Sequence, residues 1–145
     1  MDLILWRHAD AEEGAVDLER KLTKKGRKQA ARVAEWLLAR LPKGFLVIAS
    51  PAARARETAE ALGVRIGLAE ALAPGASAAD ILKAAGWPAG DATVVLVGHQ
   101  PDLGRAVAHL LCGAKDEWSI KKGGLWWISN EKGLRVNAVI SPDLL

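Results

Sequence analysis

Four residues in this chain are of types that could do phosphoryl chemistry, and each lies close behind an apolar run. They are Arg7, His8, Arg54 and His99. Arginine offers a planar fork of donors that matches phosphate oxygens, and it stays charged. Neutral histidine can act as a nucleophile or a base near neutral pH. Side chains of these two kinds, brought together, could hold a phosphoryl group and attack it.

The apolar runs that precede these residues predict the elements that position them. Short aliphatic runs bounded by polar residues are typical of buried strands, and three occur at 3–6, 45–49 and 93–97. Carboxyl ends of parallel strands share one edge of a sheet, and ligands bind at that edge in open α/β folds. We therefore expect the four residues to meet at one pocket. Gly98 would let a ligand or backbone pass close to His99.

The rest of the chain alternates helical and extended patterns. Apolar residues at three- and four-residue steps, with Thr23 and Ser77 as caps, predict helices at 24–40, 52–62, 78–85 and 102–111. Further strands are expected at 64–68, 124–129 and 134–139, the last two joined by a hairpin turn. This order predicts an α/β fold with a mostly parallel sheet that ends in an antiparallel hairpin. The length suits a single domain over residues 1–145.

Composition argues against several classes of protein. The formal net charge of +3 and the sequence pI near 9.2 are too weakly basic to indicate a nucleic-acid partner. The single cysteine, Cys112, excludes an internal disulfide and is expected to be buried, since it lies in an apolar run. The three histidines lack the i, i+4 spacing of a helical metal motif. Neither a signal peptide nor an apolar stretch of ~20 residues is recognised, which favours a cytoplasmic protein with no membrane partner.

Four segments, in this order, resemble the histidine phosphatase superfamily of phosphoglycerate mutases and acid phosphatases. They are residues 7–12 (RHADAE), residues 20–23 (RKLT) followed by Gly26, Ser50-Pro51 with Arg54 and Thr58, and residues 98–101 (GHQP). The family's usual Arg-His-Gly opening reads Arg7-His8-Ala9 in this chain. The match is closer to the short branch of SixA-type phosphohistidine phosphatases and covers roughly the first three-quarters of the chain. It implies a phosphoglycerate mutase-like, three-layer αβα sandwich with a mixed sheet of about six strands.

The resemblance also implies a role for each candidate residue. His8 would be the nucleophile that becomes phosphorylated, while Arg7, Arg54 and His99 would surround the phosphoryl group and stabilise its oxygens. Arg20 would be a further phosphate ligand. Ser50 is expected to order its loop rather than to touch the substrate. Basic side chains would supply the positive charge, so neither a metal nor another cofactor is expected.

The general acid that assists departure of an alcohol in longer members has no clear counterpart. Gln100 follows His99, where a His-Asp pair would place that acid. Asp10, Glu12 and Asp102 remain candidates, although each is also typical of a solvated loop or helix start. Because a phosphorylated imidazole leaves far more readily than an alkoxide, a missing acid favours cleavage of a P–N bond. A short chain without cap insertions would also leave the pocket open to a folded partner.

The candidate residues and the family resemblance together favour a metal-independent phosphatase that removes phosphate from phosphohistidine on proteins, through a phosphohistidine enzyme intermediate. Its partner would be a histidine-phosphorylated protein domain, and the enzyme itself is expected to be a monomer. A phosphatase of a small phosphate ester, such as a sugar or nucleotide phosphate, is the alternative. A phosphate-binding module without turnover is the third hypothesis.

Two surface features have an ordinary and a functional interpretation. Positive charge at residues 24–28 opposes the dipole of the predicted helix, and it is interpreted either as a solvated face or as a docking surface. Trp126 and Trp127 on one strand must point to opposite faces of the sheet. They are interpreted either as packing residues or as part of a partner surface.

Overall fold

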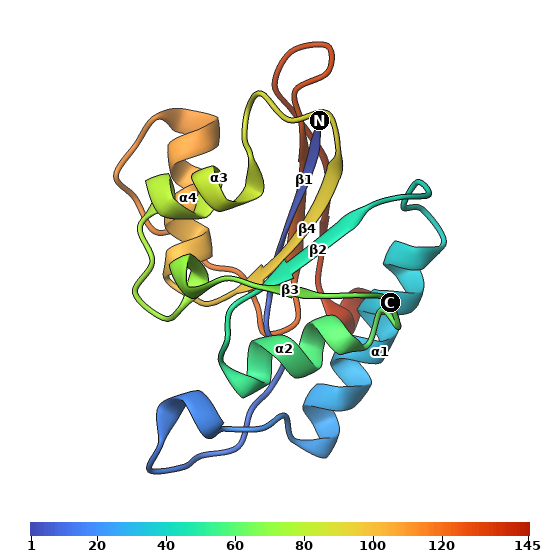
Figure 1. The fold of residues 1–145 in the computed structure, drawn as a ribbon, viewed down its shortest axis with the longest axis vertical. Coiled ribbons are helices and arrows are strands. Elements are labelled where there is room, and N and C mark those ends of the chain that lie inside the picture. Colours follow the sequence, from blue (N-terminus) through green and yellow to red (C-terminus); the bar gives the residue numbers. More distant parts are fainter.

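Six strands form one mixed sheet, and four α-helices cover its two faces, in the computed structural model of residues 1–145 (Figure 1). The strands are β1 (Asp2–Arg7), β2 (Leu46–Ala49), β3 (Gly67–Leu68), β4 (Thr93–Gly98), β5 (Leu125–Ser129) and β6 (Arg135–Ile140). The helices are α1 (Lys24–Leu38), α2 (Ala53–Glu60), α3 (Ala78–Ala85) and α4 (Asp102–Cys112). Three short 3-10 turns complete the chain: η1 (Asp17–Glu19), η2 (Glu70–Leu72) and η3 (Pro142–Leu144). The predicted order of elements is confirmed.

The strand order in the sheet is β3-β2-β4-β1-β5-β6. Strands β1 to β4 run parallel, whereas β5 pairs antiparallel with β1, and β6 pairs antiparallel with β5. The prediction of a mostly parallel sheet that ends in an antiparallel hairpin is therefore confirmed. Because β2, β4 and β1 are adjacent, their carboxyl ends lie side by side at one edge of the sheet.

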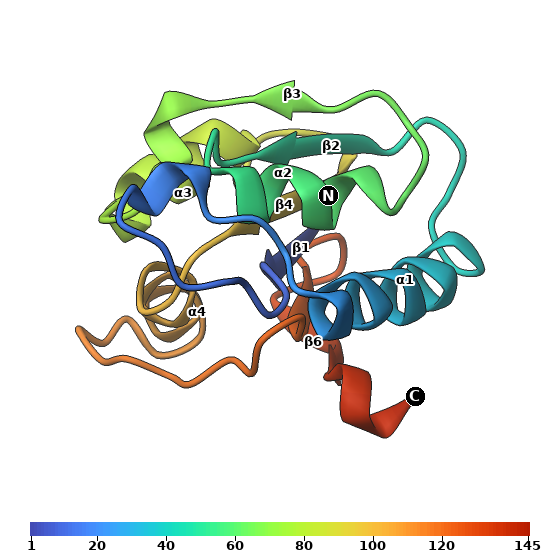
Figure 2. The same cartoon turned by 90° about the horizontal axis from the view of Figure 1, so that it is seen from below.

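Alternation along β1 divides the apolar residues between two layers of helices. Ile4 and Trp6 face α1 and α2, whereas Leu3 and Leu5 face α3 and α4. Figure 2 shows α1 and α4 on opposite sides of β1. The result is the three-layer αβα sandwich that the family resemblance implies.

The helix starts agree with the predicted caps, and the helix ends differ slightly from expectation. Thr23 Oγ1 accepts a hydrogen bond from the Gly26 amide, and Ser77 Oγ accepts one from the Asp80 amide. Helix α1 ends at Leu38 rather than at residue 40, and the Arg40 amide then bonds in an i, i+3 pattern to the Leu37 carbonyl.

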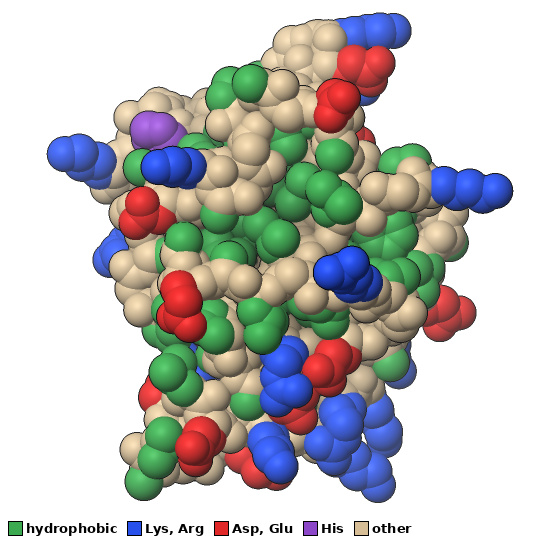
Figure 3. Space-filling view, viewed as in Figure 1, with side chains coloured by type: hydrophobic (Ala, Val, Ile, Leu, Met, Phe, Trp, Pro, Cys, Tyr) green, Lys and Arg blue, Asp and Glu red, His purple; other side chains and the backbone are tan.

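The β3 edge of the sheet is shorter than the sequence indicates. Only Gly67 and Leu68 pair with β2, although a strand was expected over 64–68. Leu46 and Leu68 are exposed there, and Figure 3 shows apolar side chains scattered over this face of the molecule.

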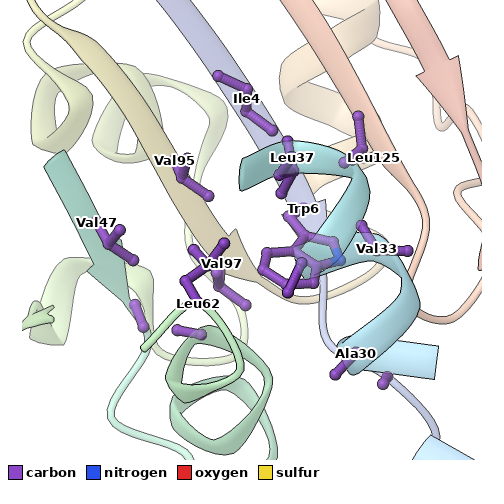
Figure 4. Packing of buried hydrophobic residues seen from close by; sticks show 14 of the residues in the cluster. Ile4, Trp6, Ala30, Val33, Leu37, Val47, Leu62, Val95, Val97 and Leu125 are labelled. Atoms are coloured by element: carbon purple, nitrogen blue, oxygen red, sulfur yellow. The ribbon is translucent and has the colours of Figure 1, made fainter. Parts of the chain in front are cut away.

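The cluster beneath α1 and α2 is built around Trp6 (Figure 4). Its indole is fully buried and lies against Val33 and Leu37 of α1 and Val97 of β4. The indole Nε1 donates a hydrogen bond of 2.9 Å to the Gly123 carbonyl, so its polar atom is satisfied. Trp6 thereby anchors the end of β1, directly before the candidate site residues.

The expectation that Cys112 is buried is wrong. Cys112 is exposed, at the last position of α4. It lies nine residues after Leu103, which faces the sheet, so at about 100° per residue it points to the opposite side of the helix. Helical phase, rather than apolar neighbours in the sequence, decides its exposure.

The two adjacent tryptophans do point to opposite faces of the sheet. Trp127 is buried edge-on against Trp36 of α1, with ring centroids 6.2 Å apart. Trp126 is half-buried on the other face, 5.5 Å from Trp118. Both side chains therefore have packing roles. None of the helices is both long and apolar enough to cross a membrane.

Replacing Gly26 by alanine is predicted to destabilise the protein, although alanine is the better helix former. A Cβ at this position would fall well inside contact distance of the Asp10 carbonyl oxygen, because the segment after His8 lies directly on the first turn of α1. Overpacking of this kind costs about 1–3 kcal/mol. Urea unfolding of the Gly26→Ala variant measures the loss. Unchanged or higher stability would contradict the close approach.

Candidate active site

The carboxyl ends of β1, β4 and β2 bring the predicted residues to one edge of the sheet. Arg7, the last residue of β1, pairs in register with Gly98 at the end of β4. His8 and His99 follow directly, and their ring centroids lie 5.2 Å apart. The predicted meeting of the two histidines is therefore confirmed.

His8 is held as a neutral imidazole with a defined tautomer. Its Nδ1–H donates a hydrogen bond of 2.8 Å to the Ala9 carbonyl. Nε2 is then left with its lone pair, which accepts a hydrogen bond of 3.3 Å from Arg54 Nε. Burial, together with the positive charges of Arg54, Arg7 and Arg20, lowers the pKa of His8 to about 4. At neutral pH the ring is uncharged, as a nucleophile must be.

Arg54 is buried in the first turn of α2 and is fixed from several sides. Its Nη1 donates to the Asp17 carbonyl at 2.7 Å, and its Nη2 donates to the Asp17 carboxylate at 3.1 Å. Thr58, one turn later, accepts from the Ala9 amide and donates to the Arg54 carbonyl. Thr58 therefore links the residues after β1 to α2 and positions His8 next to Arg54.

His99 is also neutral, and Ser50 orients it. His99 Nε2 lies 2.7 Å from Ser50 Oγ, and that oxygen already accepts from the Ala52 amide. The hydroxyl hydrogen is thus available to Nε2, which favours placing the imidazole hydrogen on Nδ1. Nδ1 is buried without a partner in the protein. Burial, followed by the charges of His8 and Arg54, lowers the pKa of His99 to about 3.

The irregular segment between α4 and β5 orients the side chain of Arg7. Its Nη1 donates to the Ile120 carbonyl at 2.7 Å, whereas its Nε is buried without a partner. Gln100 holds this segment in place, since its amide donates to the Trp118 carbonyl at 3.0 Å and accepts from the Gly104 amide at 2.7 Å. Burial lowers the pKa of Arg7 from its usual value of 12.5. Gln100 thus positions the segment between α4 and β5 through both ends of its side-chain amide.

Asp17 is a site residue that the sequence analysis missed. Its carboxylate lies 3.3 Å from Arg20 Nε and 3.1 Å from Arg54 Nη2, so it links the two arginines. The hydrogen bond from Arg54 is the main reason that the pKa of Asp17 lies below its usual value. No sequence signal distinguishes Asp17, because it is one of several acidic residues in the loop between β1 and α1.

A cleft of about 450 Å³ joins these side chains. All five residues predicted to bind phosphate or act on it line the cleft: Arg7, His8, Arg20, Arg54 and His99. Arg105 and Lys122 add two more cations, while Glu13 and Asp102 are the carboxylates. The excess of positive charge suits an anion with several oxygens. Nowhere does the structure gather three or more His, Cys, Asp or Glu side chains in a metal-binding cluster.

The candidate acids take up different places. The Asp10 carboxylate accepts hydrogen bonds from Lys122 and Thr23, which lower its pKa, and it lies outside the cleft lining. Glu12 is exposed and also outside the lining. Asp102 does line the cleft, but it is buried and accepts from the Gly75 amide at 2.9 Å. Glu13, which the sequence analysis did not name, is the exposed carboxylate of the cleft.

Known proteins resemble this chain in sequence and in fold. The family model of the histidine phosphatase superfamily (branch 1) matches residues 3–75. An uncharacterized protein from Picosynechococcus sp. is 37% identical over 137 residues, which are 86% of this chain and 82% of that protein.

Two solved structures share nearly the whole fold. A SixA-type protein from Nakamurella multipartitia is 28% identical, with a TM-score of 0.81 over 97% of this chain and 95% of the other. The protein histidine phosphatase SixA in complex with tungstate is 24% identical, with a TM-score of 0.82 over 99% of both chains. The chain belongs to the histidine phosphatase superfamily, branch 1, and within it to the short SixA-type proteins.

Proposed function

We propose that this protein is a phosphatase that removes phosphate from phosphohistidine on proteins, with His8 as the nucleophile. The observation that carries the proposal is the state of His8. The ring is neutral, its Nδ1 donates to the Ala9 carbonyl, and its Nε2 lone pair faces a cleft rich in arginine. A tetrahedral oxyanion suits such a cleft, and a SixA protein of the same fold binds tungstate.

The proposed reaction has two displacements on phosphorus. His8 Nε2 attacks in line and forms a P–N bond, while the P–N bond to the substrate imidazole breaks. The leaving imidazole carries away the bonding pair, and protonation of its second nitrogen lets it depart uncharged. Water then attacks the phosphorylated His8, inorganic phosphate leaves, and the neutral imidazole is restored. Arg7, Arg54 and the Nδ1–H of His99 would hold the three equatorial oxygens throughout.

The positions of the acids expected from the sequence, Asp10, Glu12 and Asp102, support a P–N substrate. Departure of an alkoxide requires a proton donor close to the leaving oxygen. Hydrogen bonds from Lys122 and Thr23 favour the ionised form of Asp10, and Asp102 already accepts a backbone hydrogen bond. An imidazole leaving group needs no donor of this kind, since its second nitrogen can be protonated before the bond breaks.

A small phosphate ester is the second candidate, because one exposed carboxylate does reach the cleft. Glu13 lines it and makes no hydrogen bond or ion pair through its side chain. An ester phosphatase would use this carboxyl as its proton donor. Replacing Glu13 by glutamine would then reduce ester hydrolysis strongly and leave phosphohistidine hydrolysis unchanged.

The first prediction from the proposed phosphohistidine activity is that His8→Ala abolishes release of phosphate from a histidine-phosphorylated protein, measured with EDTA present. We expect the rate to fall at least a thousandfold, since the covalent route is lost. The wild type should also form an acid-labile phosphoenzyme that the variant lacks. His109→Ala is the control, because this exposed histidine of α4 lies outside the cleft. If His8→Ala released phosphate as fast as the wild type, His8 would be ruled out as the nucleophile.

The second prediction concerns protonation. NMR titration of the free protein should show His8 and His99 becoming charged near pH 4 and pH 3, with signals assigned by their loss in alanine variants. The unfolded chain takes up these protons near pH 6.5, so the folded state should lose stability as the pH falls below about 6.5. A midpoint above pH 6 for His8 would contradict its burial beside three arginines.

The third prediction is that Ser50→Ala shifts the tautomer of His99. Without the hydroxyl hydrogen, Nε2 loses its donor, and the ring hydrogen is no longer held on Nδ1. We expect kcat to fall about tenfold or more, as for loss of one oriented donor. Imidazole ¹⁵N chemical shifts report the tautomer directly. A lower kcat with unchanged ¹⁵N shifts would mean that Ser50 acts on the loop alone.

A further inference from the structure

The amino-terminal half of α1 carries an exposed row of cations. The row consists of Lys24, Lys25, Lys28 and Arg32, called the α1 cationic stripe from here on. At about 100° per residue, these four side chains fall within roughly a third of the helix circumference, opposite the buried face. None of them takes part in any of the six ion pairs of the structure. Helix α1 has no acidic residue before Glu35.

The α1 cationic stripe works against the stability of its own helix. Positive side chains near a helix amino terminus oppose the macrodipole, and Lys24, Lys28 and Arg32 form like-charged i, i+4 pairs. The buried face of α1 follows the ordinary apolar pattern, so packing does not require these cations. A sequence selected for stability alone would place acidic residues here. The arrangement therefore points to an anionic partner.

The α1 cationic stripe begins beside the cleft. Asp10, two residues after His8, is bound to the start of α1, since its carboxylate accepts from Thr23 Oγ1 at 2.7 Å and its amide donates to Gln29. The same carboxylate accepts from Lys122, which lines the cleft. The positive charge of Lys25 contributes to lowering the pKa of Asp10. Figure 3 shows Lys and Arg side chains gathered over the lower end of α1.

We propose that the α1 cationic stripe docks an acidic face of the histidine-phosphorylated protein while its phosphohistidine occupies the cleft. This inference rests on the proposed function and adds where the protein substrate is recognised. The small net charge of +3 means that attraction comes from this local row rather than from the whole molecule. Continuity with the cleft favours a protein over a nucleic acid or a membrane, because the docked molecule must also present the phosphoryl group.

The test compares two charge reversals of equal size. Lys24→Glu/Lys28→Glu alters the α1 cationic stripe. The control, Lys132→Glu/Arg135→Glu, alters two exposed, unpaired cations close in sequence to Asn130. This control lies at the other end of the sheet from the cleft, because the Asn130 amide bonds to the Met1 carbonyl at the start of β1. Because each reversal changes the charge by two units, either double variant takes the formal net charge from +3 to −1. Glutamates at the start of α1 suit the helix dipole, so the first variant should remain folded.

The probes are a histidine-phosphorylated carrier protein of net negative charge and the free amino acid phosphohistidine. For Lys24→Glu/Lys28→Glu we expect kcat/KM on the protein to fall about tenfold or more, with a flatter dependence on salt. Hydrolysis of free phosphohistidine should stay unchanged. The Lys132→Glu/Arg135→Glu variant should match the wild type on both substrates. Thermal unfolding confirms that both variants are folded.

Several results would overturn the proposal. Equal rates on the carrier protein for wild type and Lys24→Glu/Lys28→Glu would show that the α1 cationic stripe does not dock it. An equal loss in both double variants would assign the effect to net charge. Unchanged turnover of the carrier protein, together with lost binding to RNA or to vesicles of anionic lipid, would assign the stripe to that ligand. A wild type that hydrolyses neither phosphohistidine substrate would instead refute the proposed function, and docking with it.

Discussion

The site depends on one physical constraint, which is that an imidazole must stay uncharged beside several arginines. Burial of His8 and the nearby guanidinium groups act in the same direction, since both disfavour a second positive charge. The Ala9 carbonyl then fixes the remaining proton on Nδ1, so Nε2 keeps its lone pair. In the proposed reaction, His8 and the arginines that would bind phosphate can therefore share a small space without a base to deprotonate the nucleophile. Asp17 limits the repulsion by linking Arg20 to Arg54.

The fold meets this constraint by placing the site residues on several elements rather than in one loop. Arg7 ends β1 and His8 follows it, α2 presents Arg54, and His99 follows the end of β4. Their orientations come from neighbours that never touch the phosphoryl group in the proposed reaction. Thr58 links β1 to α2, Ser50 links β2 to His99, and the Ile120 carbonyl aims Arg7. Most of these partners are backbone atoms or hydroxyls, and Asp17 is the carboxylate that pairs with Arg20 and Arg54.

Periodicity and strand ends predicted the strands, the helices and four residues of the cleft, Arg7, His8, Arg54 and His99, whereas Arg20 was expected only from the family resemblance. What it could not predict lies in segments without periodicity. Asp17 and Glu13 belong to the loop after β1, and the Ile120 carbonyl belongs to the segment before β5, where side-chain patterns do not specify a path. The sequence analysis noted only that Gln100 stands where an acid was expected, because its hydrogen bonds to Gly104 and Trp118 depend on how that segment folds back. Cys112 was misplaced because neighbouring residues were considered without helical phase.

The same electrostatics bear on the choice of substrate. A carboxyl group acts as an acid near neutral pH only when apolar surroundings or other carboxylates raise its pKa. Near this cleft the carboxyl pKa values move in the opposite direction, because Arg54 lowers the pKa of Asp17 and Lys122 lowers that of Asp10. The positive charge that suits this cleft to a phosphoryl group therefore works against Asp10 and Asp17 as proton donors. Such a site is suited to leaving groups that need little protonation by the enzyme, and an imidazole bound through nitrogen meets that condition better than an alcohol.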